Sequence, residues 1–170
     1  MNEMKNADDN RLIEQVDGLK GILNVAQVVV SSLNLDEVLQ NILNSSMAVM
    51  DMPAGTIALY DEDSSQLELR AHAGLSEKFV ALDRWRVNPG GLTHEILDCG
   101  ELFIIKDTEG TDFFNNPLAI KEGIRSLIAA PLKIQKRTIG VLYLDDFKPR
   151  EFLVEKLELL SVLTFFATMR

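Results

Sequence analysis

Apolar residues in the first fifth of the chain recur at alternating steps of four and three positions. This series consists of Leu12, Val16, Leu19, Leu23, Ala26, Val30 and Leu33. A 4-3 repeat is typical of a coiled-coil seam, so the pattern predicts a helix over 10–33 that pairs with a second copy. The alternative is an ordinary amphipathic helix packed on a sheet. Residues 1–9 are polar and mixed in charge, which predicts a disordered N-terminus.

A second helical period follows, and the pattern then changes to that of strands. Asn34 with Glu37 three residues later is a capping-box arrangement, and the helix predicted behind it ends before Pro53. The segments 54–60 and 66–73 are rich in strand-forming residues and enclose an acidic turn. They therefore predict a β-hairpin.

A second hairpin is predicted near the end of the chain, from strands over 126–134 and 138–147. Pro131 inside the first of these strands favours an edge or a bulge, where its missing N–H is harmless. A final helix is predicted from about Pro149, because proline suits a first helical turn. No glycine stop precedes Arg170, so we expect this helix to continue into an output region of a longer protein.

Short elements fill the stretch between the hairpins. Helices are predicted around 76–82, 92–97 and 118–123, and extended pieces at 85–88 and 102–107. Hairpins make antiparallel neighbours, so the whole pattern predicts an α+β fold with an antiparallel sheet. The long terminal helices should cover one face of this sheet and the short helices the other. A cavity between the sheet and the short helices is the natural ligand site.

Composition narrows the classes of function. The formal charge of −9 and the pI of about 4.7 argue against binding to nucleic acid or to anionic lipid. The single cysteine, Cys99, allows no internal disulfide and suits a reducing cytoplasm. No apolar run reaches the roughly 20 residues that span a bilayer. We therefore expect a cytoplasmic domain without direct membrane contact.

Several segments, taken in order and spacing, resemble the GAF domain family. They are LNLDEVLQNIL (33–43), AGTIALYDED (54–63), GLSEKF (74–79), NPGGLTHEIL (88–97), FNNPLAIKEGIRS (114–126) and EGIRSLIAAPLKIQKRTIGVLYLDDF (122–147). The resemblance covers roughly residues 20–168. It implies a six-stranded antiparallel sheet between a helical bundle and a lid of short helices, with 34–170 as the GAF-like domain.

The resemblance also implies a setting in signal transduction. GAF domains usually sit inside longer proteins such as bacterial sensor kinases and transcriptional regulators, and commonly form homodimers through their first and last helices. We therefore expect a homodimer through the N- and C-terminal helices and an attached output domain. The fold does not reveal the ligand.

The cofactors known from this family find little support in the residues. Covalent tetrapyrrole needs a cysteine typically followed by histidine, whereas Cys99 is followed by Gly100. Haem needs an axial histidine; His72 and His94 also suit exposed or capping positions, and His94 lies nearer the expected cavity. Non-haem iron would use carboxylates with a cysteine, and Asp98 beside Cys99 is poorly placed to share one metal. The sequence therefore leaves the cofactor unknown, with no covalent tetrapyrrole expected and with haem and iron disfavoured.

Two activities of related domains find little support in the same residues. In cyclic-nucleotide GAF domains the last helix carries a Phe and an acidic pair. Phe152 matches and the acidic pair is half present, but Lys121 and Glu122 do not reproduce the Asn-Lys pair of the lid, so the sequence does not support cyclic-nucleotide binding. Free methionine sulfoxide reductases of this family need a nucleophilic cysteine and normally a resolving one. Cys99 is the single cysteine of the chain, and we expect the neighbouring carboxylate of Asp98 to raise the pKa of its thiol. The sequence thus predicts a regulatory domain, with the reductase as a remote alternative.

The candidate ligand site lies around the extended piece 85–88 and the start of the helix 92–97. A glycine-rich turn into a helix lets backbone N–H groups approach an anionic ligand, or else simply feeds the helix. An arginine before it is a candidate counter-charge, and the single tryptophan lines the cavity or packs in the core. Arg125 is expected to hold the lid loop to the sheet. The predicted ligand-binding residues are Trp85, Arg86, Gly90, Gly91, Thr93, His94, Asp112 and Phe114.

Two interpretations of the function remain open. In the first, a ligand between sheet and lid shifts the terminal helices and changes the dimer. In the second, the chain is a dimerisation or protein-interaction module whose cavity is filled by its own side chains. The pair Asp145 and Asp146 invites a metal interpretation, but we expect both to serve as a hydrogen-bonded strand terminus.

Overall fold

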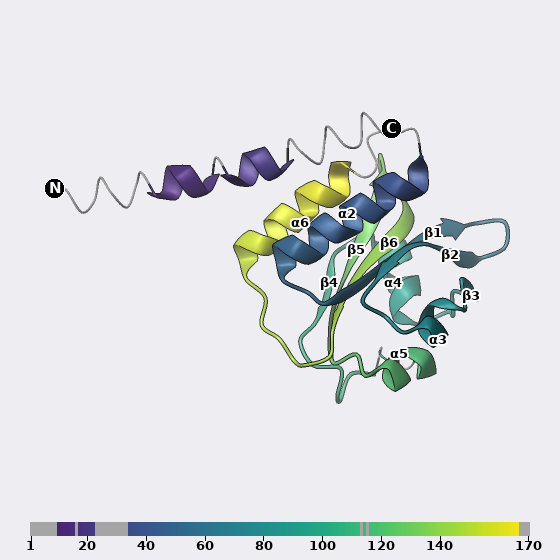
Figure 1. Ribbon diagram of the computed structural model, residues 1–170. Coiled ribbons are helices and arrows are strands. Elements are labelled where there is room, and N and C mark those ends of the chain that lie inside the picture. The colour runs from purple at the N-terminus through teal and green to yellow at the C-terminus, as the bar shows by residue number, and fades with distance from the viewer. Residues whose placement is uncertain (1–9, 16, 23–33, 113, 115, 167–170) are drawn as a thin grey trace.

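A computed structural model describes residues 10–15, 17–22, 34–112, 114 and 116–166 of the chain. Within the helix predicted over 10–33, residues 10–15 and 17–22 are helical. Val16 and the positions of the 4-3 series from Leu23 onward lie outside the described residues, as do residues 1–9. In Figure 1 the helical segments before residue 23 extend past the last helix.

The described chain contains one antiparallel sheet of six strands, in the order β3-β2-β1-β6-β5-β4. The strands are β1 (Ala54–Asp61), β2 (Gln66–Ala73), β3 (Arg84–Arg86), β4 (Phe103–Ile105), β5 (Ser126–Ile134) and β6 (Arg137–Asp146). Both predicted hairpins are present, β1–β2 and β5–β6, and β1 joins them by pairing with β6 at the centre. The predicted α+β fold with an antiparallel sheet is confirmed.

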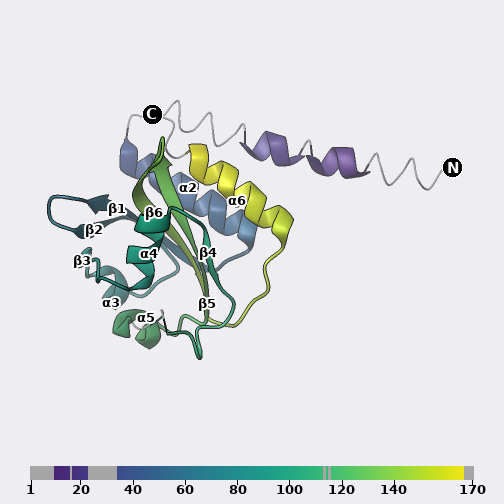
Figure 2. The ribbon, with the colours of Figure 1, turned by 180° about the vertical axis from the view of Figure 1, so that it is seen from behind.

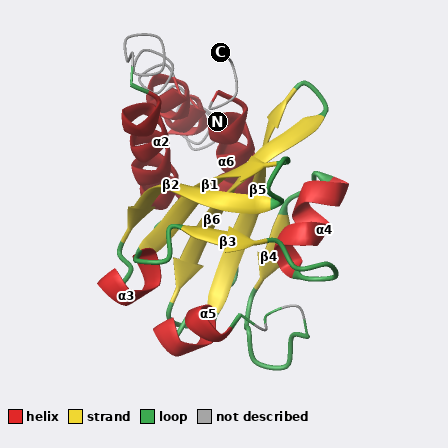
Figure 3. Ribbon diagram, turned by 90° about the vertical axis from the view of Figure 1, so that its right-hand side faces the viewer, coloured by secondary structure: helices red, strands yellow, loops and turns green. Residues whose placement is uncertain are grey.

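Two layers of helices enclose the sheet (Figures 2 and 3). The helices are α2 (Leu35–Met50), α3 (Glu77–Val80), α4 (Leu92–Cys99), α5 (Pro117–Glu122) and α6 (Val154–Phe166). Helices α2 and α6 lie side by side on one face, and α3, α4 and α5 form a lid on the other. Within the described residues, no helix combines the length and hydrophobicity needed to cross a membrane.

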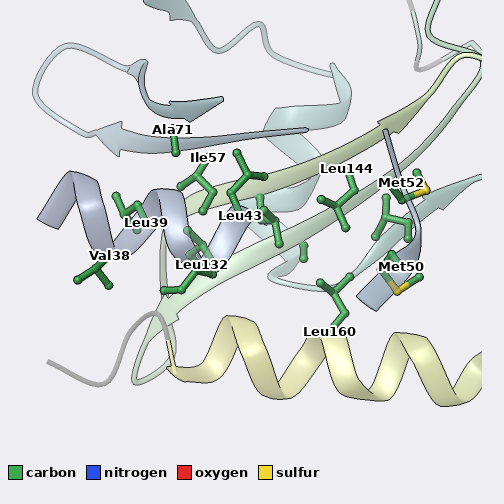
Figure 4. Close-up of a cluster of buried hydrophobic side chains, with 14 residues drawn as sticks. Val38, Leu39, Leu43, Met50, Met52, Ile57, Ala71, Leu132, Leu144 and Leu160 are labelled. Atoms are coloured by element: carbon green, nitrogen blue, oxygen red, sulfur yellow. The ribbon is translucent and has the colours of Figure 1, made fainter. Parts of the chain in front are cut away.

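The larger core lies between the sheet and the pair α2–α6. Figure 4 shows Leu43 of α2, Leu160 of α6 and Leu144 of β6 pointing into one cluster, and all three are fully buried. Each such aliphatic side chain contributes roughly 1.5–3 kcal/mol through burial. A second cluster between sheet and lid includes Ile96 of α4 and Val141 of β6. The sheet is thus covered by apolar side chains on both faces.

Local signals in the sequence set the start of α2 and the place of Pro131. Asn34 caps α2, since its side chain accepts a hydrogen bond from the backbone N–H of Asp36 at 3.0 Å. The pairing of β4 with β5 ends at Phe103 opposite Ala129. Pro131 lies two residues beyond Ala129, where no described strand pairs with β5 on the side of β4. The edge position predicted from its missing N–H is confirmed.

The last helix begins at Val154, so the start predicted near Pro149 is wrong. Arg150 explains the later start of α6, because it ties the segment before this helix to the sheet and to α2. Its backbone N–H donates to Lys106 at 3.0 Å, and its guanidinium bonds the Asp146 carboxylate at 3.2 Å and the Asp51 carbonyl. The chain therefore crosses the end of the core as an irregular strap before α6 starts.

Removal of this tie should destabilise the fold. Asp146 is only 6% exposed, so Arg150→Met leaves a buried carboxylate without its cation. We expect a loss of roughly 2–4 kcal/mol in the free energy of unfolding. The control is Arg137→Met, which removes an ion pair with Glu62 on the surface and should change stability by about 0.5 kcal/mol or less. Equal urea midpoints for the two variants would contradict the assignment.

Candidate functional site

A cavity of about 480 Å³ lies between the sheet and the lid. Its floor comes from the three central strands, through Thr56 of β1, Leu127 of β5 and Tyr143 with Asp145 of β6. Its walls come from α3, β3, the loop into α4, and α5 with the loop before it. The size falls within the range of roughly 300–1,000 Å³ that is usual for small-molecule sites.

Strand alternation decides which side chains of β6 reach the cavity. Successive side chains of a strand point to opposite faces. Leu142 and Leu144 therefore enter the core beneath α2 and α6, while Tyr143 and Asp145 face the lid. The polar groups of the floor follow directly from this two-residue period.

A hydroxyl pair links the lid to the floor. The Thr93 hydroxyl of α4 and the Tyr143 hydroxyl of β6 share a short hydrogen bond. Burial raises the pKa of Tyr143 above its ordinary value, so the phenol stays neutral and keeps its proton for hydrogen bonding. Thr93 lies in the first turn of α4, which places this bond where the glycine-rich loop meets the helix.

Asp145 is an ionisable group buried at the floor, only 4% exposed. Its neighbours across the sheet are Ala54 on β1 and Leu127 on β5, which offer no side-chain donor. Among the described residues, no hydrogen bond or ion pair reaches its carboxylate. Burial raises the pKa of Asp145 to about 7, and the negative charge of Glu122 adds to this shift. The cavity therefore contains a polar group with unused bonding capacity.

Polar bonds join two of the short lid elements, α3 and α5, to one another. The Glu122 carboxylate of α5 accepts hydrogen bonds from the backbone N–H and the hydroxyl of Ser76, both at 2.6 Å. Ser76 is also the N-cap of α3, where its hydroxyl accepts from the N–H of Phe79 at 3.3 Å. One carboxylate thus joins α3 to α5 across the lid.

Arg125 fixes the loop that follows β4, as the sequence predicted. Its guanidinium bonds the Asp107 carboxylate at 3.1 Å and pairs with Glu109 at 3.4 Å. A backbone hydrogen bond from Glu109 and this bond from Arg125 lower the pKa of Asp107. The backbone N–H of Arg125 donates to the Asp146 carbonyl at 2.8 Å, so the lid loop is tied to the end of β6.

The loop into α4 brings backbone donors to the cavity. Gly90 has φ +78°, the left-handed region that favours glycine, and its place is open to solvent. Gly91 is the N-cap of α4 and has no side-chain capping bond. The N–H groups of the first helical turn have no partner within the helix. Arg86 lies before this loop with an exposed side chain, and no ion pair with a described residue engages it.

Six of the eight residues predicted for the site line this cavity. They are Trp85, Arg86, Gly90, Gly91, Thr93 and Phe114. His94 and Asp112 are not among the lining residues. His94 follows Thr93 by one helical step of about 100°, which turns it away from the cavity, and its Nδ1 atom is buried without a hydrogen-bond partner among the described groups. Asp112 is exposed in the loop before α5.

The sequence interpretation missed the polar floor. Thr56, Tyr143 and Asp145 were not predicted for the site, although the alternation in 138–147 separates Tyr143 and Asp145 from their apolar neighbours. The expectation that Asp145 and Asp146 both serve as a strand terminus is correct for Asp146 alone, which accepts a bond from the N–H of Phe147 at 2.7 Å. Asp145 points to the lid instead, because neighbouring residues of a strand face opposite sides.

Cys99 lies outside the cavity lining, at the exposed C-terminal end of α4. Its thiol donates to the Glu95 carboxylate at 3.8 Å. Partial desolvation, followed by the negative charges of Glu95, Glu101 and Asp98, raises the pKa of this thiol. A raised pKa lowers the thiolate fraction on which cysteine reactivity depends.

Comparison with known proteins gives relatives of several kinds. A family model described as "GAF domain" matches residues 32–169. The Nif-specific regulatory protein of Azospirillum lipoferum is 29% identical over 128 residues, covering 73% of this chain and 20% of that protein. The chain thus spans about a fifth of the length of the curated relatives it matches.

Solved structures share the fold at low identity. The GAF domain of a phosphoenolpyruvate-protein phosphotransferase from Coxiella burnetii has a TM-score of 0.78 at 18% identity, covering 90% of this chain and 91% of that one. Residues 122 to 287 of a methyl-accepting chemotaxis protein have a TM-score of 0.71 at 18% identity, covering 85% and 92%. At such identity the likeness concerns the fold alone.

The raised pKa of Asp145 predicts a pH-dependent stability. An acid whose pKa is higher in the folded state, here about 7 against an ordinary 3.8, stabilises the fold at low pH, and this contribution is lost as pH rises through about 7. Asp145→Asn lacks the titration. Between about pH 4 and about pH 8, the free energy of unfolding of the wild type should fall by roughly 4 kcal/mol relative to this variant.

Urea titrations across this pH range measure the difference. Asp63→Asn is the control, because Asp63 is exposed in the β1–β2 turn, and its curve should run parallel to that of the wild type. A constant difference between wild type and Asp145→Asn at all pH values would contradict the burial of an unpaired carboxyl group.

Proposed function

The chain belongs to the GAF domain family, and we propose that it is a sensing domain of a signalling protein, which binds a small molecule between sheet and lid. GAF domains occur in regulatory proteins, among them the Nif-specific regulatory protein to which this chain is similar. The observation that supports binding is the cavity of about 480 Å³. Trp85, Leu92 and Phe114 border this space and leave it open.

The central strands offer a mechanical route from ligand to output. Leu127 of β5 lines the cavity, and the next residue, Ile128, packs in the core beneath α2 and α6. A ligand that draws the lid toward the floor shifts this strand against both helices. We propose that α6 carries the shift to an output region of a longer, cytoplasmic protein.

The proposed ligand contacts combine sequence and structure. From the predicted set we retain Trp85, Arg86, Gly90, Gly91, Thr93 and Phe114, and from the structure we add Asp145 and Tyr143. We assign no catalysis to the domain. A reductase mechanism would need a reactive thiol beside the ligand, whereas Cys99 lies outside the lining and has a raised pKa.

A second candidate function is dimerisation, supported by apolar surface on the terminal helices. Helix α6 buries Leu160 and Leu163 but leaves Val154 66% exposed and Val162 36% exposed. A helix that is apolar on both sides is normally covered on both. The predicted seam residues Leu12 and Leu19 are 60% and 58% exposed.

The segment 17–22 lies beside α6, because a side chain added at Gly18 would come within 3.9 Å of Leu159 on α6. The helical segment that carries Leu19 is therefore a neighbour of α6. We propose that they form the interface of a homodimer, compatible with ligand binding on the opposite side of the sheet.

Native mass spectrometry of freshly purified protein tests ligand binding. We expect a mass above the denatured mass, lost when the protein unfolds. Ala119→Phe places a ring in the cavity, because Ala119 lines it and is 6% exposed, and this variant should lose the excess. Ala81→Phe, at an exposed lid position outside the lining, should retain it. Equal masses in native and denatured wild type would argue against a stably bound ligand.

Light scattering after size exclusion tests the homodimer. The double variant Leu12→Glu, Leu19→Glu puts charges on the proposed seam and should weaken dimerisation by at least about tenfold. Ile120→Glu is the control, since Ile120 is 56% exposed on α5, across the sheet from α6. A monomeric wild type at micromolar concentration, or a dimer unaffected by the two added charges, would contradict the proposed dimer interface.

A further inference from the structure

The carboxylate of Asp145 lies at one end of the cavity floor, and no described cation pairs with it. The register of the sheet places Asp145 opposite Ala54, at the start of β1. Arg86, the sole cationic residue of the described lining, pairs with Gln66, which in turn pairs with Asp61 at the far end of β1. Arg86 and Asp145 thus lie at opposite corners of the sheet, and Asp145 is left without a counter-charge in the described part of the chain.

The bonding capacity of Asp145 is directed at the cavity. The residue lines this space and is only 4% exposed. An ionised carboxyl group in such a place is unfavourable, because it has lost water and, among the described residues, has gained neither a hydrogen bond nor an ion pair. A ligand that brings a positive charge together with N–H donors removes this penalty. The floor therefore favours a cationic ligand over a neutral or an anionic one.

The charges around Asp145 act in the same direction. Glu122 of α5 is the charged neighbour that acts on it, and its negative charge helps to raise the pKa of Asp145. Strands β1 and β5 place Ala54 and Leu127 beside it, and α3 contributes Phe79 to the cavity wall. None of these three side chains carries a charge. A carboxylate with a second carboxylate nearby attracts a cation and repels an anion.

The rest of the lining suits an ammonium group on an apolar body. The Tyr143 hydroxyl lies two residues from Asp145 on the same face of β6, and Thr56 of β1 pairs with Tyr143 across the sheet. An ammonium group has three donors, which a carboxylate and hydroxyl oxygens can accept. The walls above this floor are apolar and include Phe79, Leu82, Trp85, Leu92 and Phe114.

A metal ion fits this lining less well than an organic cation. Within the described ranges, no group of three or more His, Cys, Asp or Glu side chains is placed to hold a metal ion. The hard cations Ca²⁺ and Mg²⁺ take six or more oxygen ligands. One carboxylate beneath apolar walls offers few of these, whereas an ammonium group is satisfied by two or three acceptors.

We propose that the cavity takes a small primary amine in its ammonium form, with the charged nitrogen against the Asp145 carboxylate and an apolar body along the walls. This assignment rests on the proposed function, because it names the ligand class for the same cavity. It requires no contact with Arg86. The carboxylate selects the charge, and the walls select the body.

Trp85 allows a direct measurement, because it is the single tryptophan of the chain and lines the cavity. The full chain is titrated with butylamine, isopentylamine and phenethylamine, and tryptophan fluorescence is followed. We expect saturable binding of at least one amine. Butanol, isopentyl alcohol and phenethyl alcohol keep the body and lack the charge, so each should bind roughly tenfold or more weakly than its amine.

A substitution at the floor separates the ammonium contact from binding of the apolar body. Asp145→Asn keeps the shape of the side chain and removes its charge. It should weaken amine binding by about 30-fold or more and change alcohol binding by less than about threefold. Asp63→Asn is the control, because it removes an exposed carboxylate of the β1–β2 turn, and it should bind both probes like the wild type. Thermal unfolding checks that both variants are folded.

The pH dependence of the wild type is a second test that needs no substitution. Alkylamines stay protonated to about pH 10, so a change below that pH comes from the protein. Asp145 has a raised pKa of about 7, and its ionised form binds the ammonium group. Amine affinity should therefore rise roughly tenfold per pH unit from about pH 5 to about pH 7 and level off above about pH 8, while alcohol affinity stays constant. An amine affinity independent of pH would contradict the contact with Asp145.

The failures of the two proposals are distinguishable. An amine that binds wild type and Asp145→Asn equally, or no better than its alcohol, would overturn the ammonium assignment. A co-purified compound without a basic nitrogen, together with no amine binding, would overturn the amine and leave the sensing function intact. No bound compound in the native mass spectrum and no response to any probe would overturn both.

Discussion

The two-residue period of the central strands is the constraint on which the structure depends. Strands β5 and β6 lie inside the sheet, each between two neighbouring strands, and are covered on both faces. Every second side chain must therefore suit the core beneath α2 and α6, and the side chains between them form the floor under the lid. A change in register of one residue would exchange these two sets, placing Asp145 in the apolar core and Leu144 in the cavity. Register and site are thus specified together.

The two faces are stabilised by different means. Beneath α2 and α6 the contacts are apolar and continuous, and Arg150 closes the end of that core by joining Asp51, Asp146 and the strap before α6. Under the lid, the apolar cluster around Ile96 and Val141 covers only part of the sheet. The remainder of that face carries Thr56, Tyr143 and Asp145 and borders open space. The face beneath α2 and α6 is therefore closely packed, whereas the face under the lid borders the open cavity.

Helix α3 is the part of the lid best suited to movement, because it is short and its connection to α5 depends on polar bonds. Helix α3 has no buried residue and is joined to α5 through Ser76 and Glu122. Such contacts are individually weak when exposed to water, and segments with few buried apolar contacts open at low energetic cost. Among the described residues, the bond between Thr93 and Tyr143 joins α4 to the floor through hydroxyl groups, and Ile96 of α4 packs against the same face of the sheet. A ligand that contacts both layers would add to these contacts.

The sequence by itself determined the elements and the fold class, because hydrophobic periods and turn residues are local signals. The two hairpins, the cap at Asn34, the edge position of Pro131 and the loop into α4 all follow from neighbours in the chain, and so does most of the predicted lining. The start of α6 was misplaced because Arg150 bonds residues about 100 positions earlier in the chain. Only the tertiary structure showed that Asp112 does not line the cavity and gave Asp145 its place in the floor. The chemistry of a carboxylate depends on which face of the sheet it occupies and on what lies opposite, and that is decided by β1, β5 and the lid rather than by its sequence neighbours.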